Sequence, residues 1–196
     1  MSHLLAEIGF INELEKLKTI SRYNKVIGGF RHENSAEHSW HLAVMALLFA
    51  GRTKFENLDL LKVLKMVLIH DIVEIDCGDT FLYDEEKRRE SALSEEQAAE
   101  RIFGLLPTPQ GAEFLALWRE FEARQSPEAL FAASLDALQP LLNHLVSCPP
   151  HSNDAQLTKS KVLGKKAFIA DVSPTLWQIA IEAIDRSVEQ GLYHNC

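Results

Sequence analysis

Apolar positions along the chain recur mainly at spacings of three and four residues, which places them on one face of an α-helix. Residues 3–17 show this pattern clearly, with leucines and isoleucines separated by acidic residues and lysine. No run of alternating apolar and polar residues is long enough to predict a strand. The predicted helices are residues 3–17, about 35–50, 58–75, 94–105, a segment ending near 124, 127–146, 155–169 and 175–189. The pattern therefore predicts an all-α fold, a bundle of about six to eight helices.

Residues that begin or end helices support several of these boundaries. Asn34 and Glu37 have the spacing of a capping pair at the start of the second helix. Two consecutive glycines precede them, so the connection before this helix is expected to be extended. The strongly charged run 81–92 is expected to form either a mobile loop or an exposed helix. A second capping pair predicts that the next helix begins at Ser94.

Composition narrows the class of protein. The chain has 196 residues, of which 46% are apolar, and this length favours one domain. We expect that domain to span residues 1–196, with its motif-bearing core at about 17–146 and C-terminal helices at 155–190 packed on the core. The net charge of −8 argues against binding of a nucleic-acid polymer, which needs clustered lysine and arginine.

The expected location is the cytoplasm. The three cysteines form no CxxC pair, which suits a reducing compartment. The longest nearly uncharged run, 42–51, has about half of the roughly 20 residues that a membrane span needs, so no membrane partner is expected. The N-terminus lacks the pattern of a secretory signal.

The stretch 62–80 begins as an ordinary core helix and ends in polar groups. At helical spacing Val67, His70 and Glu74 share one face, while Asp71 interrupts a neighbouring row of leucine and isoleucine. A carboxylate in apolar surroundings must be paired or bound to a cation, because an unpartnered ion there costs several kcal/mol. The His70-Asp71 pair is therefore the first indication of a metal centre.

Two further residues of the same kinds occur where helices should be buried. His38 is early in the second helix, and Asp136 lies among alanines that let another helix approach closely. Pro140 removes the amide that would bond the carbonyl of Asp136, so a kink is predicted there. Two imidazoles and two carboxylates form a shell suited to Mn, Fe, Co, Ni or Zn, without the thiolates of structural zinc. His41, one turn after His38, is an alternative ligand.

The order of these residues resembles the HD-domain metal-dependent phosphohydrolase superfamily. The sequences ENSAEHS, HDIVEIDCGDT and SLDAL are similar to its 5′-deoxynucleotidase branch and the relatives called HD domain-containing protein 2. An isolated HD dipeptide is a weak signal, but the combination of these three segments in this order is a strong one. The resemblance covers about residues 17–143, which is most of the chain.

The resemblance implies an all-α domain, often dimeric, that hydrolyses deoxynucleoside monophosphates to deoxynucleoside and phosphate using one divalent transition metal. By motif position the metal ligands are His38, His70, Asp71 and Asp136, and the catalytic carboxylates are Glu74 and Asp79. The pair that faces the substrate, Arg-Trp in the deoxynucleotidases, is Arg22-Tyr23 here. An arginine is well suited to bidentate binding of phosphate, and tyrosine keeps an aromatic face while adding a hydroxyl group.

Several alternatives stand beside this interpretation. Asp76 competes with Asp79 for the catalytic role, and Arg31 is a second candidate for binding phosphate. His144 and His151 are expected to be structural or exposed. The same scaffold also suits a nucleoside triphosphatase, a cyclic-nucleotide phosphodiesterase, or a catalytically inactive module that binds a nucleotide and regulates a partner. Glu74 and Asp79 favour an enzyme, because a pure binding module needs no carboxylates beside the metal.

Overall fold

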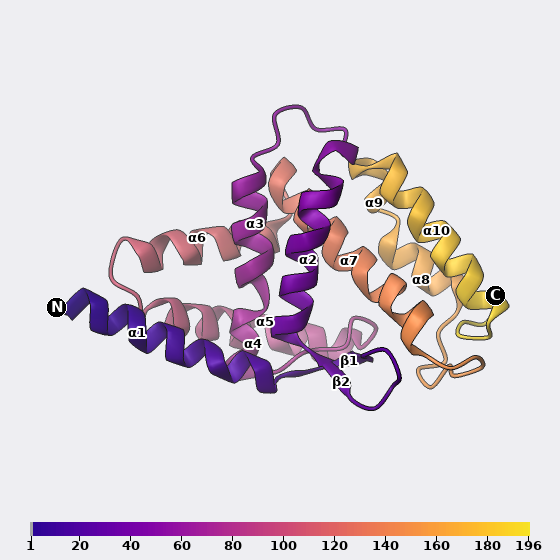
Figure 1. The fold of residues 1–196 in the computed structure, drawn as a ribbon, viewed down its shortest axis with the longest axis horizontal. Helices are drawn as coiled ribbons and strands as arrows, with labels where there is room; N and C mark the ends of the chain where they lie inside the picture. Colours follow the sequence, from indigo (N-terminus) through magenta and orange to yellow (C-terminus); the bar gives the residue numbers. More distant parts are fainter. Residues whose placement is uncertain (1) are drawn as a thin grey trace.

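Helix α7 (Pro127–Ser147) runs through the middle of the molecule and contacts α2, α3, α6, α9 and α10 (Figure 1). The structure is a computed structural model that describes residues 2–196. Small and large apolar side chains alternate on the buried surface of α7, where Ala129, Ala132 and Ala133 let neighbouring helices approach Phe131 and Leu135. This central helix carries Asp136.

The other elements precede and follow α7 in simple order. They are α1 (Ser2–Leu14), η1 (Glu15–Thr19), β1 (Ser21–Lys25), β2 (His32–Asn34), α2 (Ser35–Phe49), η2 (Ala50–Arg52), α3 (Leu60–Ile69), η3 (His70–Val73), α4 (Glu74–Cys77), α5 (Glu85–Phe103), α6 (Gln110–Ala123), α8 (Lys159–Lys166), α9 (Ile169–Val172) and α10 (Pro174–Glu189). Eight helices of at least eight residues lie within residues 2–196, so the all-α prediction is confirmed.

The start of α2 agrees with its capping signal. The Asn34 side chain accepts a hydrogen bond from the backbone N–H of Glu37 at 2.9 Å, and the Glu37 carboxylate accepts one from the backbone N–H of Asn34 at 3.1 Å. These two bonds satisfy donors that the first turn of a helix leaves free. They fix the first turn of α2, and with it the position of His38.

A short hairpin that sequence reasoning did not predict precedes α2. Strands β1 and β2 are antiparallel, with Ser21 opposite Asn34 and Lys25 opposite His32. Five and three residues are too few to show a recognisable alternation, and Gly28, with a φ of +89°, helps form the turn between them. Because Asn34 ends β2 and caps α2, the hairpin places Arg22 beside the start of α2.

The predicted continuous helix 58–75 is interrupted at His70. Helix α3 ends at Ile69, a 3₁₀ turn covers η3, and α4 then completes four further residues. In a 3₁₀ turn the side chains three residues apart lie one above the other, so Asp71 and Glu74 point to the same side. The interruption thereby brings two carboxylates to one place.

The N-terminal cap of helix α5 lies ten residues earlier than expected. Asp84 caps it by accepting from the backbone N–H of Lys87, whereas the Ser94 hydroxyl donates to a carbonyl one turn back within the helix. The prediction of a start at Ser94 is therefore wrong. Residues 85–92 of the charged run form the mostly exposed first turns of α5, which is one of the two expected outcomes.

The C-terminal helices pack against the rest of the chain. Helix α10 lies along α7 and also contacts α8 and α9 (Figure 1). The helix predicted at 155–169 is divided into α8 and α9 with a break between them. Apolar residues from α2 to α10 belong to a single core, although the assignment of residues 1–196 to one HD domain stays a prediction. No helix in residues 2–196 is both long enough and apolar enough to cross a membrane.

Candidate active site

His70 lies at the point where α3 becomes a 3₁₀ turn. Its Nδ1 is 3.1 Å from the carbonyl oxygen of Val67, which is only an acceptor, so Nδ1 carries the proton and Nε2 carries a lone pair. This Nε2 is buried and has no hydrogen-bond partner in the part of the chain that the structure describes. It is 3.0 Å from Oδ1 of Asp71, although the two atoms are not aligned for a hydrogen bond. A buried lone pair without a partner is typical of a metal-binding histidine.

His38 is held in the same way by side chains of α7 and β2. Its Nδ1 lies 3.0 Å from the amide oxygen of Gln139, whose amide nitrogen donates to the buried carboxylate of Glu33 at 3.0 Å. Because the Gln139 amide nitrogen faces Glu33, the amide oxygen faces His38, and this oxygen can only accept a hydrogen bond. His38 therefore donates from Nδ1, and its Nε2 is left with a lone pair. His41, the alternative ligand, lies 3.3 Å from Gln139 instead. The side chain of His38 is completely buried.

The two imidazoles face the carboxylates of Asp71 and Asp136. His38 Nε2 is 3.1 Å from Oδ1 of Asp136 and 4.0 Å from Oδ2 of Asp71, and His70 Nε2 is 3.9 Å from Oδ1 of Asp136. Potential ligand atoms of His38, His70 and Asp71 lie within 4.8 Å of one another. Asp136, from α7, reaches both rings. We call these four residues, His38, His70, Asp71 and Asp136, the His-Asp cluster. Its side chains come from α2, η3 and α7.

The charges in this cluster fit a divalent cation. Burial and the nearby Arg22 lower the pKa of His38, which favours the neutral ring. Burial alone would raise the pKa of Asp136, but the neighbouring His38 and His70 rings and the positive charge of Arg22 hold it well below the usual range. The lone pairs of imidazole nitrogens and carboxylate oxygens face a common space, and a cation can satisfy them all. The residues present therefore fit a divalent transition metal.

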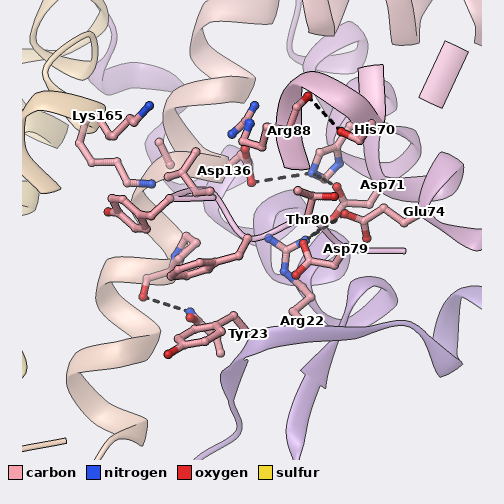
Figure 2. A pocket seen from close by; sticks show the side chains of 18 of the residues that line it. Arg22, Tyr23, His70, Asp71, Glu74, Asp79, Thr80, Arg88, Asp136 and Lys165 are labelled. Carbon is pink, nitrogen blue, oxygen red and sulfur yellow. Dashed lines mark hydrogen bonds and ion pairs between the residues drawn. The ribbon is translucent and has the colours of Figure 1, made fainter. Parts of the chain in front are cut away.

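Arg22, Glu74 and Asp79 adjoin the cluster (Figure 2). Arg22 Nη1 is 2.7 Å from Asp71, 3.7 Å from Asp79 and 3.8 Å from Glu74. Burial would lower the pKa of Arg22, but these carboxylates raise it, so the guanidinium stays charged. Gly78, with a φ of +74°, ends α4 and turns the chain so that Asp79 returns toward Arg22.

Glu74 and Asp79 hold their protons more strongly than ordinary carboxyl groups. Burial and the neighbouring Asp71 raise the pKa of Glu74, and burial likewise raises the pKa of Asp79. The Ser35 hydroxyl, in the first turn of α2, donates to Glu74 Oε2 at 2.5 Å. Carboxyl groups with raised pKa values beside a metal site are suited to proton transfer near neutral pH.

These groups line a cavity of about 320 Å³. One side is aromatic: the Tyr23 and Phe81 rings are tilted by 31° to each other with their centroids 4.3 Å apart, and Tyr83 lies next to Phe81. Another side, which we call the basic wall, consists of Arg88, Arg124, Lys165 and Lys166. In Figure 2, Arg88 and Lys165 lie across the pocket from Arg22 and Tyr23.

The structure brings together most of the residues singled out in the sequence. His38, His70, Asp71, Asp136, Glu74, Asp79 and Arg22 form one connected group, and Tyr23 lines the same cavity. Their roles as metal ligands, catalytic groups and substrate contacts stay predictions.

The alternative residues lie elsewhere. Asp76 pairs with Arg101 on the surface at 2.5 Å, and Arg31 pairs with Glu37 at 2.6 Å. His144, in contrast, lines the cavity, where its ring stacks on Tyr193.

Sequence reasoning missed the basic wall and the Gln139-Glu33 support of His38. Lys166 carried a usable signal, because it lies between Val162 and Ile169 at spacings of four and three, within an apolar stripe. A lysine in such a stripe is expected to be buried. Burying its charge is costly unless a partner is near. Arg88 and Arg124 gave no such signal, because both are exposed residues near helix ends.

The fold and the cluster define an all-α protein with a buried His-His-Asp site suited to a metal. A family model described as HD domain matches residues 14–177, and the chain belongs to this family. A crystal structure of a predicted metal-dependent phosphohydrolase from Magnetospirillum magnetotacticum MS-1 is 42% identical, covers 98% of this chain and 99% of its own, and superposes with a TM-score of 0.89.

Two further relatives are informative. The 5'-deoxynucleotidase HDDC2 of Bos taurus is 32% identical over 134 residues, which are 68% of this chain and 63% of that protein. The chain thus matches a little under two thirds of the relative's length. The cyanophage S-2L HD phosphohydrolase DatZ, solved with dA and one catalytic Zn²⁺ ion, is 19% identical, covers 91% of this chain and 96% of its own, and has a TM-score of 0.58, a likeness of fold.

Proposed function

We propose that this chain is a metal-dependent phosphohydrolase that converts deoxynucleoside 5′-monophosphates to deoxynucleoside and phosphate. The observation that carries the proposal is the placement of Arg22, Glu74 and Asp79 around a His-Asp cluster inside one cavity. The cavity volume of about 320 Å³ lies at the lower end of the range for small-molecule sites. The 5'-deoxynucleotidase name of the HDDC2 relatives supports the choice of substrate.

His38, His70, Asp71 and Asp136 would hold one divalent ion. Such an ion lowers the pKa of water and polarises a phosphoryl oxygen, which is the chemistry that phosphate-ester hydrolysis needs at neutral pH. The donor set suits Mn, Co, Fe, Ni or Zn. Gln139 and the Val67 carbonyl fix the orientation of the two rings.

The remaining residues position the substrate and move protons. In the reaction a water oxygen bonds to phosphorus, the bond from phosphorus to O5′ breaks, and a proton must reach O5′. Glu74, which burial keeps protonated, supplies that proton and recovers one from the attacking water. Asp79 assists from the same side, and Arg22 orients the phosphate. The adjacent Tyr23 and Phe81 rings give the nucleoside an aromatic surface.

Location and assembly are part of the proposal. We propose a cytoplasmic protein with a small nucleotide as its partner and no nucleic-acid polymer, in keeping with the net charge of −8. We also propose a homodimer, because Leu5, Ile8 and Ile11 of α1 are exposed and form an apolar stripe. Light scattering measures the assembly.

The test of function is phosphate release from a panel of deoxy- and ribonucleoside monophosphates with Mn²⁺ or Co²⁺ added. We expect deoxynucleoside monophosphates to be hydrolysed and EDTA to abolish the reaction. If metal-loaded protein hydrolyses nothing while nucleotides still raise its melting temperature, the chain is a nucleotide-binding module and the enzyme proposal is wrong.

A further inference from the structure

Lys166 is a buried cation that lines the cavity. Only 3% of this residue is exposed, and its stem lies in the apolar stripe of α8 with Val162 and near Ile169, both fully buried. Among the described residues, no carboxylate is within ion-pair distance of its ammonium group, and no hydrogen bond to that group is found. Burying a charge without a partner is costly, so such a group is retained where a ligand supplies the missing charge.

Three arginines lie near Lys166, together with the carboxylate of Asp136. Burial lowers the pKa of Lys166 to about 8, the charge of Asp136 opposes this change, and Arg124, Arg22 and Arg88 each lower the pKa further. The guanidinium of Arg124 lies over the ring of Phe168, two residues along the chain from Lys166. Several like charges around one cavity attract an anion, because each charge is less stable without it.

Arg22 alone is a poor match for a phosphate dianion. Its guanidinium already has Asp71 at 2.7 Å and two further carboxylates within 3.8 Å, so much of its charge is offset within the protein. Lys165 is also paired, with Glu85 at 2.7 Å. Two further acidic residues, Glu95 and Glu122, line the cavity. Of the basic wall, Lys166, Arg88 and Arg124 have no ion pair within residues 2–196, and Lys166 is the one of the three that is buried.

We propose that Lys166, assisted by Arg124, binds the phosphate group of the substrate from the side of the cavity that α6 and α8 form. The substrate phosphate would then lie between the basic wall and the His-Asp cluster, with Arg22 on the other side. This inference rests on the proposed function for the identity of the substrate, but the binding of phosphate itself does not depend on turnover.

The first test is calorimetric titration of the metal-loaded protein with inorganic phosphate. The variant Lys166→Met keeps a flexible side chain of similar length and removes the charge. We expect its dissociation constant for phosphate to rise by roughly ten-fold or more, the loss that removal of a charged hydrogen bond produces. The control Lys159→Met removes a lysine that begins the same helix and pairs with Asp185, and its phosphate affinity should match the wild type.

Kinetics separate binding from a general structural effect. For deoxynucleoside monophosphates we expect Lys166→Met to raise KM by about the same factor as the dissociation constant of phosphate while kcat changes by less than about three-fold. Arg124→Asn is a second variant, chosen because Arg124 has a φ of +49°, which asparagine adopts readily. It should weaken phosphate binding by a smaller factor and tests the basic wall even if Lys166→Met does not fold.

Unchanged phosphate affinity in both variants overturns the inference. If the wild type hydrolyses no nucleotide but binds phosphate through Lys166, the proposed function fails and this inference stands. If the wild type hydrolyses nucleotides and the variants bind phosphate equally well, the inference fails and the function stands.

Discussion

The cavity has two walls that are built in different ways. The His-Asp cluster comes from α2, η3 and α7, and His38 and His70 are buried and oriented by a second group, Gln139 or the Val67 carbonyl. The basic wall comes from the first part of α5, the end of α6 and the end of α8, and only Lys166 in it is buried. The difference indicates that the first wall supplies fixed geometry and the second supplies charge, so mutations should affect them differently.

The largest effect is expected in the His-Asp cluster. Asp71→Ala should abolish retention of the metal and therefore turnover, whereas Glu74→Ala should keep the metal and lower kcat by about 10²–10⁴-fold, the usual contribution of a proton-transfer group. Metal analysis of the purified variants, together with phosphate release, measures both. Asp76→Ala is the matched control, because Asp76 pairs with Arg101 outside the cavity. Loss of the metal in both variants would mean that Glu74 is a ligand.

A smaller effect is expected one step away from the cluster. Gln139→Leu removes the acceptor for His38 Nδ1 and the donor for Glu33, so the ring loses its fixed orientation. We expect metal affinity to fall by about 10- to 100-fold, as for other second-layer partners of metal ligands. Competition with a chelator measures this affinity.

Ser134→Ala, on the same helix, serves as the control for the Gln139 variant. It removes a buried hydroxyl that bonds only the Leu130 carbonyl, so stability should fall slightly while metal affinity stays unchanged. Equal metal affinity in Gln139→Leu and the wild type would contradict the positioning role.

The smallest effect, on stability, is expected in the basic wall. The pKa of Lys166 is lowered from 10.5 to about 8 on folding, so below pH 8 the folded protein carries a buried charge at a cost of up to about 3 kcal/mol. Between pH 8 and 10.5 the unfolded chain keeps the proton that the folded chain has lost, so wild-type stability rises with pH. Lys166→Met should therefore be more stable than the wild type at pH 7, with the difference shrinking toward pH 10.

Urea unfolding of both proteins at pH 7 and pH 10 measures this difference. Other titrating groups contribute equally to the two proteins and cancel in the comparison. A variant that is less stable than the wild type at pH 7 would show that the Lys166 ammonium has a stabilising partner within the protein.

The two walls also differ in how far the sequence predicts them. His38, His70, Asp71 and Asp136 stand out because polar ligands in helices that should be buried demand an explanation, and the structure groups them. Helix caps such as Asn34 are equally readable, because the capping bonds involve residues three positions apart.

What could not be predicted depends on contacts between distant segments. The β1–β2 hairpin is too short to show a period. Both Asp84 and Ser94 have side chains that can cap a helix, but Asp84 is the residue that caps α5. The 3₁₀ turn at His70 leaves no trace in the apolar pattern. The basic wall joins residues 88, 124, 165 and 166, which are neighbours only after α5, α6 and α8 pack around the same cavity.

The central claim is that α2, η3 and α7 present two imidazole nitrogens and two carboxylates to a single divalent ion. Anomalous diffraction from crystals of the protein grown with Mn²⁺ or Co²⁺ tests it most directly. We predict one strong peak per chain at roughly 2.0–2.2 Å from Nε2 of His38 and His70 and from oxygens of Asp71 and Asp136. A map without a peak in this cluster, or with its only peak at other acidic residues, would show that these four residues do not hold the ion.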